Sequence, residues 1–140
     1  MNIVAAKGLV KDYNSLRAVD NIDFEIAKGE CFGFLGPNGA GKTTVMRMLF
    51  CFLPPTKGEI RIFDMDALKN PGKIKSRIGV MPQDENLDIE LTVLENLIAY
   101  ARYFDIPKFK SIGIAARLLD YIGLSEKRDV NIRKLSGGMK

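Results

Sequence analysis

Runs of apolar residues divide the first eighty residues into predicted strands. Apolar and polar residues alternate along 19–26, which is typical of a half-exposed strand and favours antiparallel pairing with the run before it. The runs at 30–35 and 78–81 are short and almost continuously apolar, which predicts buried strands of a central sheet. The predicted strands cover 3–10, 19–26, 30–35, 59–63 and 78–81.

Apolar residues at helical spacing predict three helices. The first follows residue 43 and is ended by the prolines at 54 and 55. The second begins at Thr92, because Thr92 and Glu95 have the S/T-x-x-E form of a capping box. The third ends at Gly123, a typical C-cap residue. Their apolar faces, read as core, are Val45, Met48, Leu49 and Phe52, then Val93, Leu97, Ala101 and Phe104, then Ala115, Leu118, Leu119 and Ile122.

Composition places the chain among ordinary globular domains. It has 140 residues, of which 46% are hydrophobic and 27% charged, so a sizeable core is expected and disorder is not. No apolar run is long enough to cross a bilayer and no signal peptide is visible, so a cytosolic location is the default expectation. The net charge of +4 comes from scattered lysines and arginines, which favours a solvated surface, and no nucleic-acid partner is expected.

The two cysteines do not indicate a metal site. Cys31 and Cys51 lack a C-x-x-C spacing, and the chain has no histidine that could complete a zinc set. Two buried, small apolar side chains are the expected interpretation.

One segment carries the strongest chemical signal. It fits the phosphate-binding pattern G-x-x-x-x-G-K-[ST] at every fixed position, between a predicted strand and a predicted helix. Glycines let successive N–H groups converge on one point, and the helix start adds its unpaired donors. The alternative, a tight turn that binds nothing, is disfavoured by these flanks. The segment comprises Gly36, Pro37, Asn38, Gly39, Ala40, Gly41, Lys42 and Thr43.

Three further places are candidates for binding. Tyr13 lies in an expected polar turn at 11–15, where a platform for a base and an ordinary packed tyrosine are equally favoured. Gln83 follows a predicted core strand, where open α/β sheets place ligands. Ser136 precedes two glycines as an expected helix N-cap, which could form another anion site but is a weak signal alone.

Taken together, these motifs resemble the nucleotide-binding cassette of ABC transporters over essentially the whole chain. The resemblance implies an α/β fold: a P-loop NTPase core with an N-terminal antiparallel β subdomain and a helical subdomain. It implies one partial cassette over 1–140, with the β subdomain and phosphate-loop part at about 1–82 and the Q-loop and helical part at about 83–140. The amino-acid sequence at 78–87 is similar to that of exporters of the drug-resistance and nodulation-factor type.

The resemblance also implies a role for each candidate residue, with ATP and Mg²⁺ as cofactors. Tyr13 stacks on adenine, and Thr44, next to the phosphate-binding segment, lies near the α-phosphate. Lys42 holds the β- and γ-phosphates, and Thr43 and Gln83 reach Mg²⁺. Gln83 also reaches the attacking water and senses the membrane subunit, so Lys42 and Gln83 are the expected catalytic residues. The family signature matches Leu135, Ser136, Gly137 and Gly138, of which the last three contact the ATP of a partner cassette, and Met139 replaces the usual glutamine.

The family pattern continues beyond the signature with an aspartate, a catalytic glutamate and a switch histidine. The chain ends at Lys140 without them, so it is expected to be an incomplete cassette with exposed apolar sheet edge and no turnover of its own. The intact parent is expected to be an ATPase that drives export, pairing head to tail with a second cassette and resting on membrane permease subunits at the inner face of the membrane. The alternatives are a soluble cassette ATPase acting on ribosomes or DNA, and a fragment that does not bind nucleotide.

Overall fold

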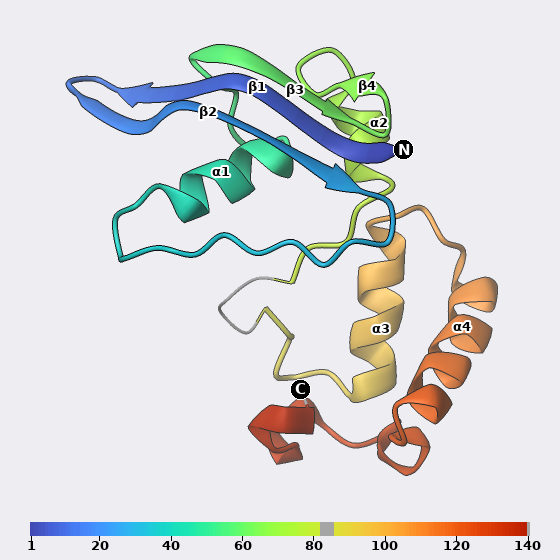
Figure 1. Cartoon of the computed structure of the whole chain (residues 1–140). Helices are drawn as coiled ribbons and strands as arrows, with labels where there is room; N and C mark the ends of the chain where they lie inside the picture. Colours follow the sequence, from blue (N-terminus) through green and yellow to red (C-terminus); the bar gives the residue numbers. More distant parts are fainter. Residues whose placement is uncertain (82–85, 140) are drawn as a thin grey trace. The chain divides into compact units, whose positions relative to one another are not determined.

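The computed structural model describes residues 1–81 and 86–139, and it divides the chain into two compact units, Met1–Val80 and Met81–Lys140 (Figure 1). The first unit contains β1 (Asn2–Tyr13), β2 (Leu16–Ala27), α1 (Lys42–Leu49), β3 (Lys57–Ile62), β4 (Met65–Asp66) and α2 (Pro71–Lys75). The second contains α3 (Val93–Arg102), α4 (Lys108–Tyr121) and three 3-10 turns at Ser125–Lys127, Ile132–Lys134 and Gly137–Met139. Among the described residues, none of the helices has the length and apolar character needed to cross a membrane.

The first unit is built on a four-stranded antiparallel sheet in the order β2-β1-β3-β4. The expected strands at 3–10, 19–26 and 59–63 are confirmed, and the antiparallel pairing of the first two is confirmed as well. The expected polar turn at 11–15 is too long. Strand β1 continues to Tyr13, which pairs with Leu16, so only Asn14 and Ser15 form the turn.

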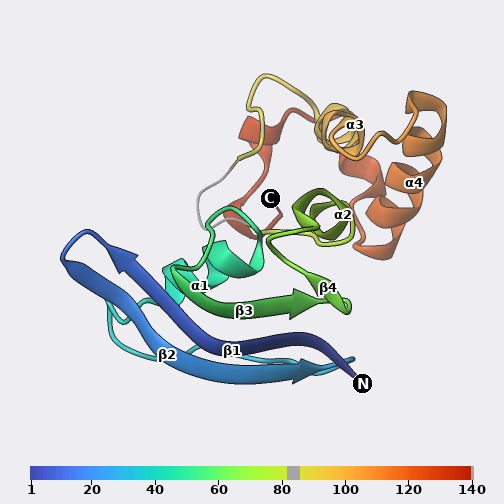
Figure 2. The ribbon, with the colours of Figure 1, turned by 90° about the horizontal axis from the view of Figure 1, so that it is seen from above.

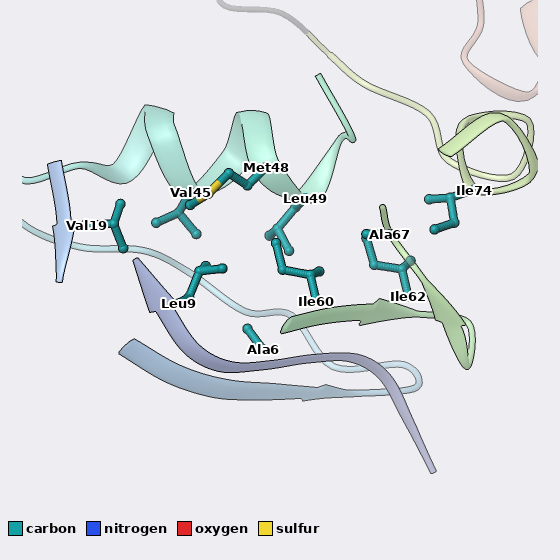
Figure 3. Close-up of a cluster of buried hydrophobic side chains, with 10 residues drawn as sticks. All are labelled: Ala6, Leu9, Val19, Val45, Met48, Leu49, Ile60, Ile62, Ala67 and Ile74. Atoms are coloured by element: carbon teal, nitrogen blue, oxygen red, sulfur yellow. The ribbon is translucent and has the colours of Figure 1, made fainter. Parts of the chain in front are cut away.

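The core of the first unit lies between α1 and the sheet (Figure 3). Figure 2 shows α1 and α2 on the same face of the strands. Val45, Met48 and Leu49 of α1 are buried as expected. Phe52 is not part of this face, because α1 ends at Leu49 and a left-handed residue at Cys51 turns the chain away. The buried cluster comprises Ala6, Leu9, Val19, Val45, Met48, Leu49, Ile60, Ile62, Ala67 and Ile74.

The two expected core strands at 30–35 and 78–81 are wrong for this structure. Within residues 1–81 and 86–139, neither segment is paired with a neighbouring strand, and most of their residues are exposed. Backbone that is extended becomes a strand only when a neighbour accepts its hydrogen bonds, and these segments lack that neighbour here. Phe32 and Phe34 instead pack against Phe24 of β2, with ring centroids 5.8 and 5.2 Å away.

The two cysteines differ in burial. Cys51 is partly buried, and burial raises the pKa of its thiol. Cys31 is exposed, contrary to expectation, because it lies in the segment at 30–35 that has no strand neighbour.

The second unit packs α3 against α4 and the 3-10 turns. Thr92 and Glu95 form the expected capping box, with the Glu95 N–H donating to Thr92 Oγ1 and the Thr92 N–H donating to the Glu95 carboxylate. Gly123 has φ +70 just beyond α4, as expected for a C-cap glycine. The expected apolar faces are wrong in part, since three of their members are exposed and the buried face of α4 includes a serine instead. The exposed members are Phe104, Leu118 and Ile122, and the buried residues of α4 are Ser111, Ala115 and Leu119.

A buried asparagine joins two segments of the second unit. Asn96 of α3 is 3% exposed, accepts from the Asp88 N–H at 2.9 Å and donates to the carbonyls of Asp88 and Thr92 at 2.9 and 3.0 Å. The same stretch pairs with the chain before the last 3-10 turn, since the Val93 N–H donates to the Val130 carbonyl at 3.0 Å. Residues 88–94 and 128–132 therefore form one hydrogen-bonded body, joined by an isolated β-bridge and three backbone hydrogen bonds.

Candidate nucleotide-binding site

The phosphate loop, residues 36–43, connects the extended segment at 30–35 to the first turn of α1. Gly39 and Gly41 have φ of +85° and +84°, a conformation that side chains rarely adopt. Gly41 is the N-cap of α1, and a Cβ there would lie 2.3 Å from the carbonyl oxygen of Ala18 on β2. The glycine therefore serves both the left-handed turn and the close contact between the loop and the sheet.

Lys42 lies across this loop. Its ammonium donates to the carbonyl oxygens of Gly36 and Pro37, with Nζ–O distances of 2.7 and 2.8 Å. An ammonium has three N–H donors, so these bonds leave one for an anion in front of the loop. The two bonds also hold the loop in its curved shape, since they join its first two carbonyls to its seventh residue.

The start of α1 adds further donors. The Val45 N–H makes the first backbone hydrogen bond of the helix, to the Gly41 carbonyl at 2.9 Å. The N–H groups of Lys42, Thr43 and Thr44 precede it at the positive end of the helix dipole. Thr43 is exposed and Thr44 is half-buried. Backbone N–H groups at a helix start, one ammonium and an exposed hydroxyl are the groups that a triphosphate and its cation require, so the residues present fit such a ligand.

Tyr13 lies at the end of β1, next to the hairpin turn, and its side chain is exposed enough to be touched by a ligand. The residue is 40% exposed, and the Lys11 ammonium lies 5.4 Å from its ring centroid. Arg17 of β2 bonds Asp12 across the hairpin at 2.9 Å and Asp20 on its own strand at 3.0 Å. The hydrogen bond to Asp12 is the main cause that raises the pKa of Arg17. Tyr13 and the phosphate loop thus belong to one unit, joined through β2.

The remaining candidates lie elsewhere. Gln83 falls outside the described residues. Ser136 precedes the 3-10 turn Gly137–Met139, as expected, and the Met139 N–H donates to the Ser136 carbonyl at 2.9 Å. Leu135 is buried in the second unit, whereas Ser136, Gly137 and Gly138 are exposed. No group of three or more acidic, cysteine or histidine side chains suited to a metal occurs in the part of the chain that the structure describes.

Sequence reasoning missed two contacts of this site. The first is between Gly41 and Ala18, for which the glycine itself was the available signal, because close backbone approach excludes a side chain. The second is between Lys11 and Tyr13, for which the spacing of two along a strand was the signal, since such residues share a face.

A phosphate loop at the head of a helix, packed against a sheet, defines the class of P-loop nucleotide-binding proteins. A family model described as "ABC transporter" matches residues 19–140, which is most of the chain. The chain therefore belongs to the ABC transporter family, and the expected α/β fold of a P-loop NTPase with an antiparallel β subdomain and a helical subdomain is confirmed.

Two relatives show how far the similarity extends. "Nod factor export ATP-binding protein I" of Paraburkholderia xenovorans is 42% identical over 130 residues, which cover 93% of this chain and 43% of that protein. The protein of the same name in Rhizobium meliloti is 40% identical over 132 residues, covering 94% of this chain and 39% of that protein. The chain therefore spans less than half the length of these relatives.

Solved structures agree with the fold. The chain matches MJ1267, described as "an ATP-binding cassette of an ABC transporter", with a TM-score of 0.82 and 25% identity, covering 99% of this chain and 61% of that one. It matches cbiO1 from Clostridium perfringens with a TM-score of 0.87 and 24% identity, covering 99% and 57%. The second likeness concerns the fold alone.

Proposed function

We propose that this chain is the ATP-binding part of an ABC transporter subunit that couples the binding and hydrolysis of Mg-ATP to export. One observation supports this above the others: Lys42 is held by two carbonyls over a glycine loop that opens onto the N-terminus of α1. That arrangement brings an ammonium and the backbone donors of a helix start into one loop, which is what a polyphosphate tail needs. The names of the relatives support the same function.

Each proposed contact follows from the chemistry of its side chain. Lys42 and the backbone N–H groups of residues 36 and 38–44 hold the phosphates, Pro37 having no N–H to donate, and Tyr13 stacks on the adenine. Thr43 and Gln83 are proposed as ligands of Mg²⁺, which when bound neutralises charge on the β- and γ-phosphates. The proposed division is a phosphate-binding part up to about residue 82 and a Q-loop and helical part from about residue 83.

The proposed partners are a second cassette and membrane permease subunits. In this arrangement Ser136, Gly137 and Gly138 donate to the γ-phosphate held by the partner cassette, so the pair closes on ATP and opens after hydrolysis. The protein then rests at the inner face of the membrane through the permease. Hydrolysis is proposed for the whole protein, since the relatives are more than twice as long.

Export is the proposed direction, because the relatives are named as export proteins and the sequence around Gln83 resembles that of exporters. The alternative of a soluble cassette ATPase acting on ribosomes or DNA is not favoured by these relatives.

The test is calorimetric titration of the folded chain with Mg-ATP. The chain is expected to bind ATP, and Lys42→Ala is expected to weaken binding by at least about tenfold, because a charge-assisted hydrogen bond is lost. Lys28→Ala is the matched control, since Lys28 is exposed in the turn after β2. A folded chain that does not bind ATP, or a Lys42→Ala variant that binds ATP as tightly as the parent, would contradict the proposal.

A further inference from the structure

Lys11 connects the hairpin that carries Tyr13 to the chain that follows the phosphate-binding helix. Its ammonium donates to the Pro54 carbonyl, with an Nζ–O distance of 2.8 Å. The same ammonium lies 5.4 Å from the centroid of the Tyr13 ring, within the range of a cation–π contact. One charged group thus contacts both an aromatic ring and a turn distant in the sequence.

The hairpin is fixed to the same turn by backbone groups. The Thr56 N–H donates to the Val10 carbonyl at 2.8 Å, and the Asp12 N–H donates to Thr56 Oγ1 at 3.0 Å. These bonds hold the strand next to Tyr13, but neither touches the ring itself. The Lys11 ammonium, from the residue two positions earlier on the strand, does contact the ring.

The other end of the arrangement is fixed as well. Gly41 lies against the Ala18 carbonyl, so β2 holds the phosphate loop directly. Tyr13 and the contact point of the phosphate loop, Ala18, therefore both belong to the β1–β2 hairpin. A ring that is already oriented loses less conformational freedom when a base stacks on it.

We propose that Lys11 is a positioning residue for base binding: it orients the Tyr13 ring from one side, through its bond to Pro54, so that a purine stacks on the ring. This inference rests on the proposed function, because it assumes that Tyr13 receives the base. It assigns to Lys11 no contact with the phosphates. Its effect must therefore depend on the base and on Tyr13.

The experiment compares ATP with inorganic tripolyphosphate, which has no base, by calorimetric titration of the full chain. Lys11→Met keeps the aliphatic stem and removes the charge. It is expected to weaken ATP binding by about two- to fivefold, the range of an exposed cation–π contact, and to leave tripolyphosphate binding unchanged. Lys11→Arg, which keeps a cation and donors, is expected to restore ATP binding.

Two further variants distinguish positioning from a general loss of charge or stability. Lys7→Met removes an exposed charge from the same strand and is expected to leave both affinities unchanged. Tyr13→Leu is expected to weaken ATP binding by about fivefold or more. In that background Lys11→Met should add nothing, because a residue that acts through the ring has no effect once the ring is gone.

The outcomes separate the inference from the function on which it rests. A Lys11→Met variant that binds ATP like the parent, or that loses ATP and tripolyphosphate equally, overturns the inference alone when Tyr13→Leu still weakens ATP binding. Full additivity of the two substitutions overturns it as well. A chain that binds neither ligand, or a Tyr13→Leu variant with unchanged ATP affinity, overturns the proposed base site and the inference with it.

Discussion

Strand β1 and the segment at 30–35 have similarly apolar sequences but different structures. Leu9 in β1 is 0% exposed, whereas Leu35 in the segment is 97% exposed. Strand β1 has partners on both sides, in β2 and β3, and the segment has none within the described residues. The difference shows that an apolar run becomes a strand only when its neighbours are present.

The two regions differ in where a partner can come from. The partner of β1 follows after a two-residue turn, so closing the hairpin costs little entropy. A buried strand of a parallel sheet pairs across a crossover of a dozen residues or more, and its neighbours are distant in the sequence. The apolar sequence of 30–35 favours a buried strand, but the residues near it in the sequence do not supply a strand to pair with.

Hydrogen exchange tests the comparison with the largest expected effect. Amides in the paired part of β1 should exchange at least about a thousandfold more slowly than those of 31–35, since opening the sheet costs about 5 kcal/mol or more. Mass-spectrometric exchange on the folded chain measures both in one sample. Equal protection of the two regions would mean that the segment is paired in solution.

Two leucine substitutions are expected to differ strongly in stability. Leu9→Ala removes a buried side chain and should lower the free energy of unfolding by about 2–5 kcal/mol. Leu35→Ala removes an exposed one and should change it by less than about 0.5 kcal/mol. Urea unfolding followed by circular dichroism gives both values. A large loss for Leu35→Ala would show that this residue is buried in solution.

Two glycines of the phosphate loop give a smaller, matched contrast. Gly39→Ala meets only the unfavourable left-handed backbone, at roughly 1–2 kcal/mol, because nothing lies within 4 Å of the new Cβ. Gly41→Ala should cost more, because its Cβ would also collide with the Ala18 carbonyl on β2. Chemical unfolding of both variants measures the difference, and equal losses would mean that loop and strand are not in contact.

The capping box of Thr92 and Glu95 gives the smallest expected effect. Unlike a strand, it forms between residues that are close in the sequence. Hydrogen bonds from Thr92, first from its backbone N–H, lower the pKa of Glu95. A lowered pKa in the folded state stabilises the fold above the unfolded value of about 4.3, and this contribution is lost as pH falls through the folded value. Unfolding at pH 7 should therefore separate the parent from Glu95→Gln, and the difference should vanish near pH 2.

Glu126→Gln is the control for this pH dependence, since Glu126 is an exposed glutamate of the same unit outside the capping box. A difference between parent and Glu95→Gln that persists at low pH would mean that the carboxylate charge is not what stabilises the helix start.

The sequence predicted the elements that carry their own signals. The hairpin followed from alternation along 19–26, and the start of α3 from Thr92 and Glu95. The end of α1 could not be read from its apolar spacing, because the left-handed turn at Cys51 ends the helix before Phe52. The exposure of Leu118 on α4 was also missed. Leu118 follows buried Ala115 by three residues, a spacing that predicts a shared face, but its side chain is exposed.

The site was predictable in its parts and less so in its contacts. The pattern at 36–43 specified a glycine loop before a helix, which is where the structure has it. The bonds from Lys42 to the loop carbonyls and the contact between Gly41 and Ala18 depend on tertiary geometry. The spacing of residues in the sequence does not reveal that a loop contacts a strand some twenty residues before it.

The hydrogen bonds around Asn96 have a mechanical consequence. They anchor Asp88 to α3, and the pairing of Val93 with Val130 joins the same segment to residues 128–132. Because hydrogen bonds of 2.9–3.2 Å join residues 88–94 to α3 and to residues 128–132, these stretches are expected to move together rather than independently.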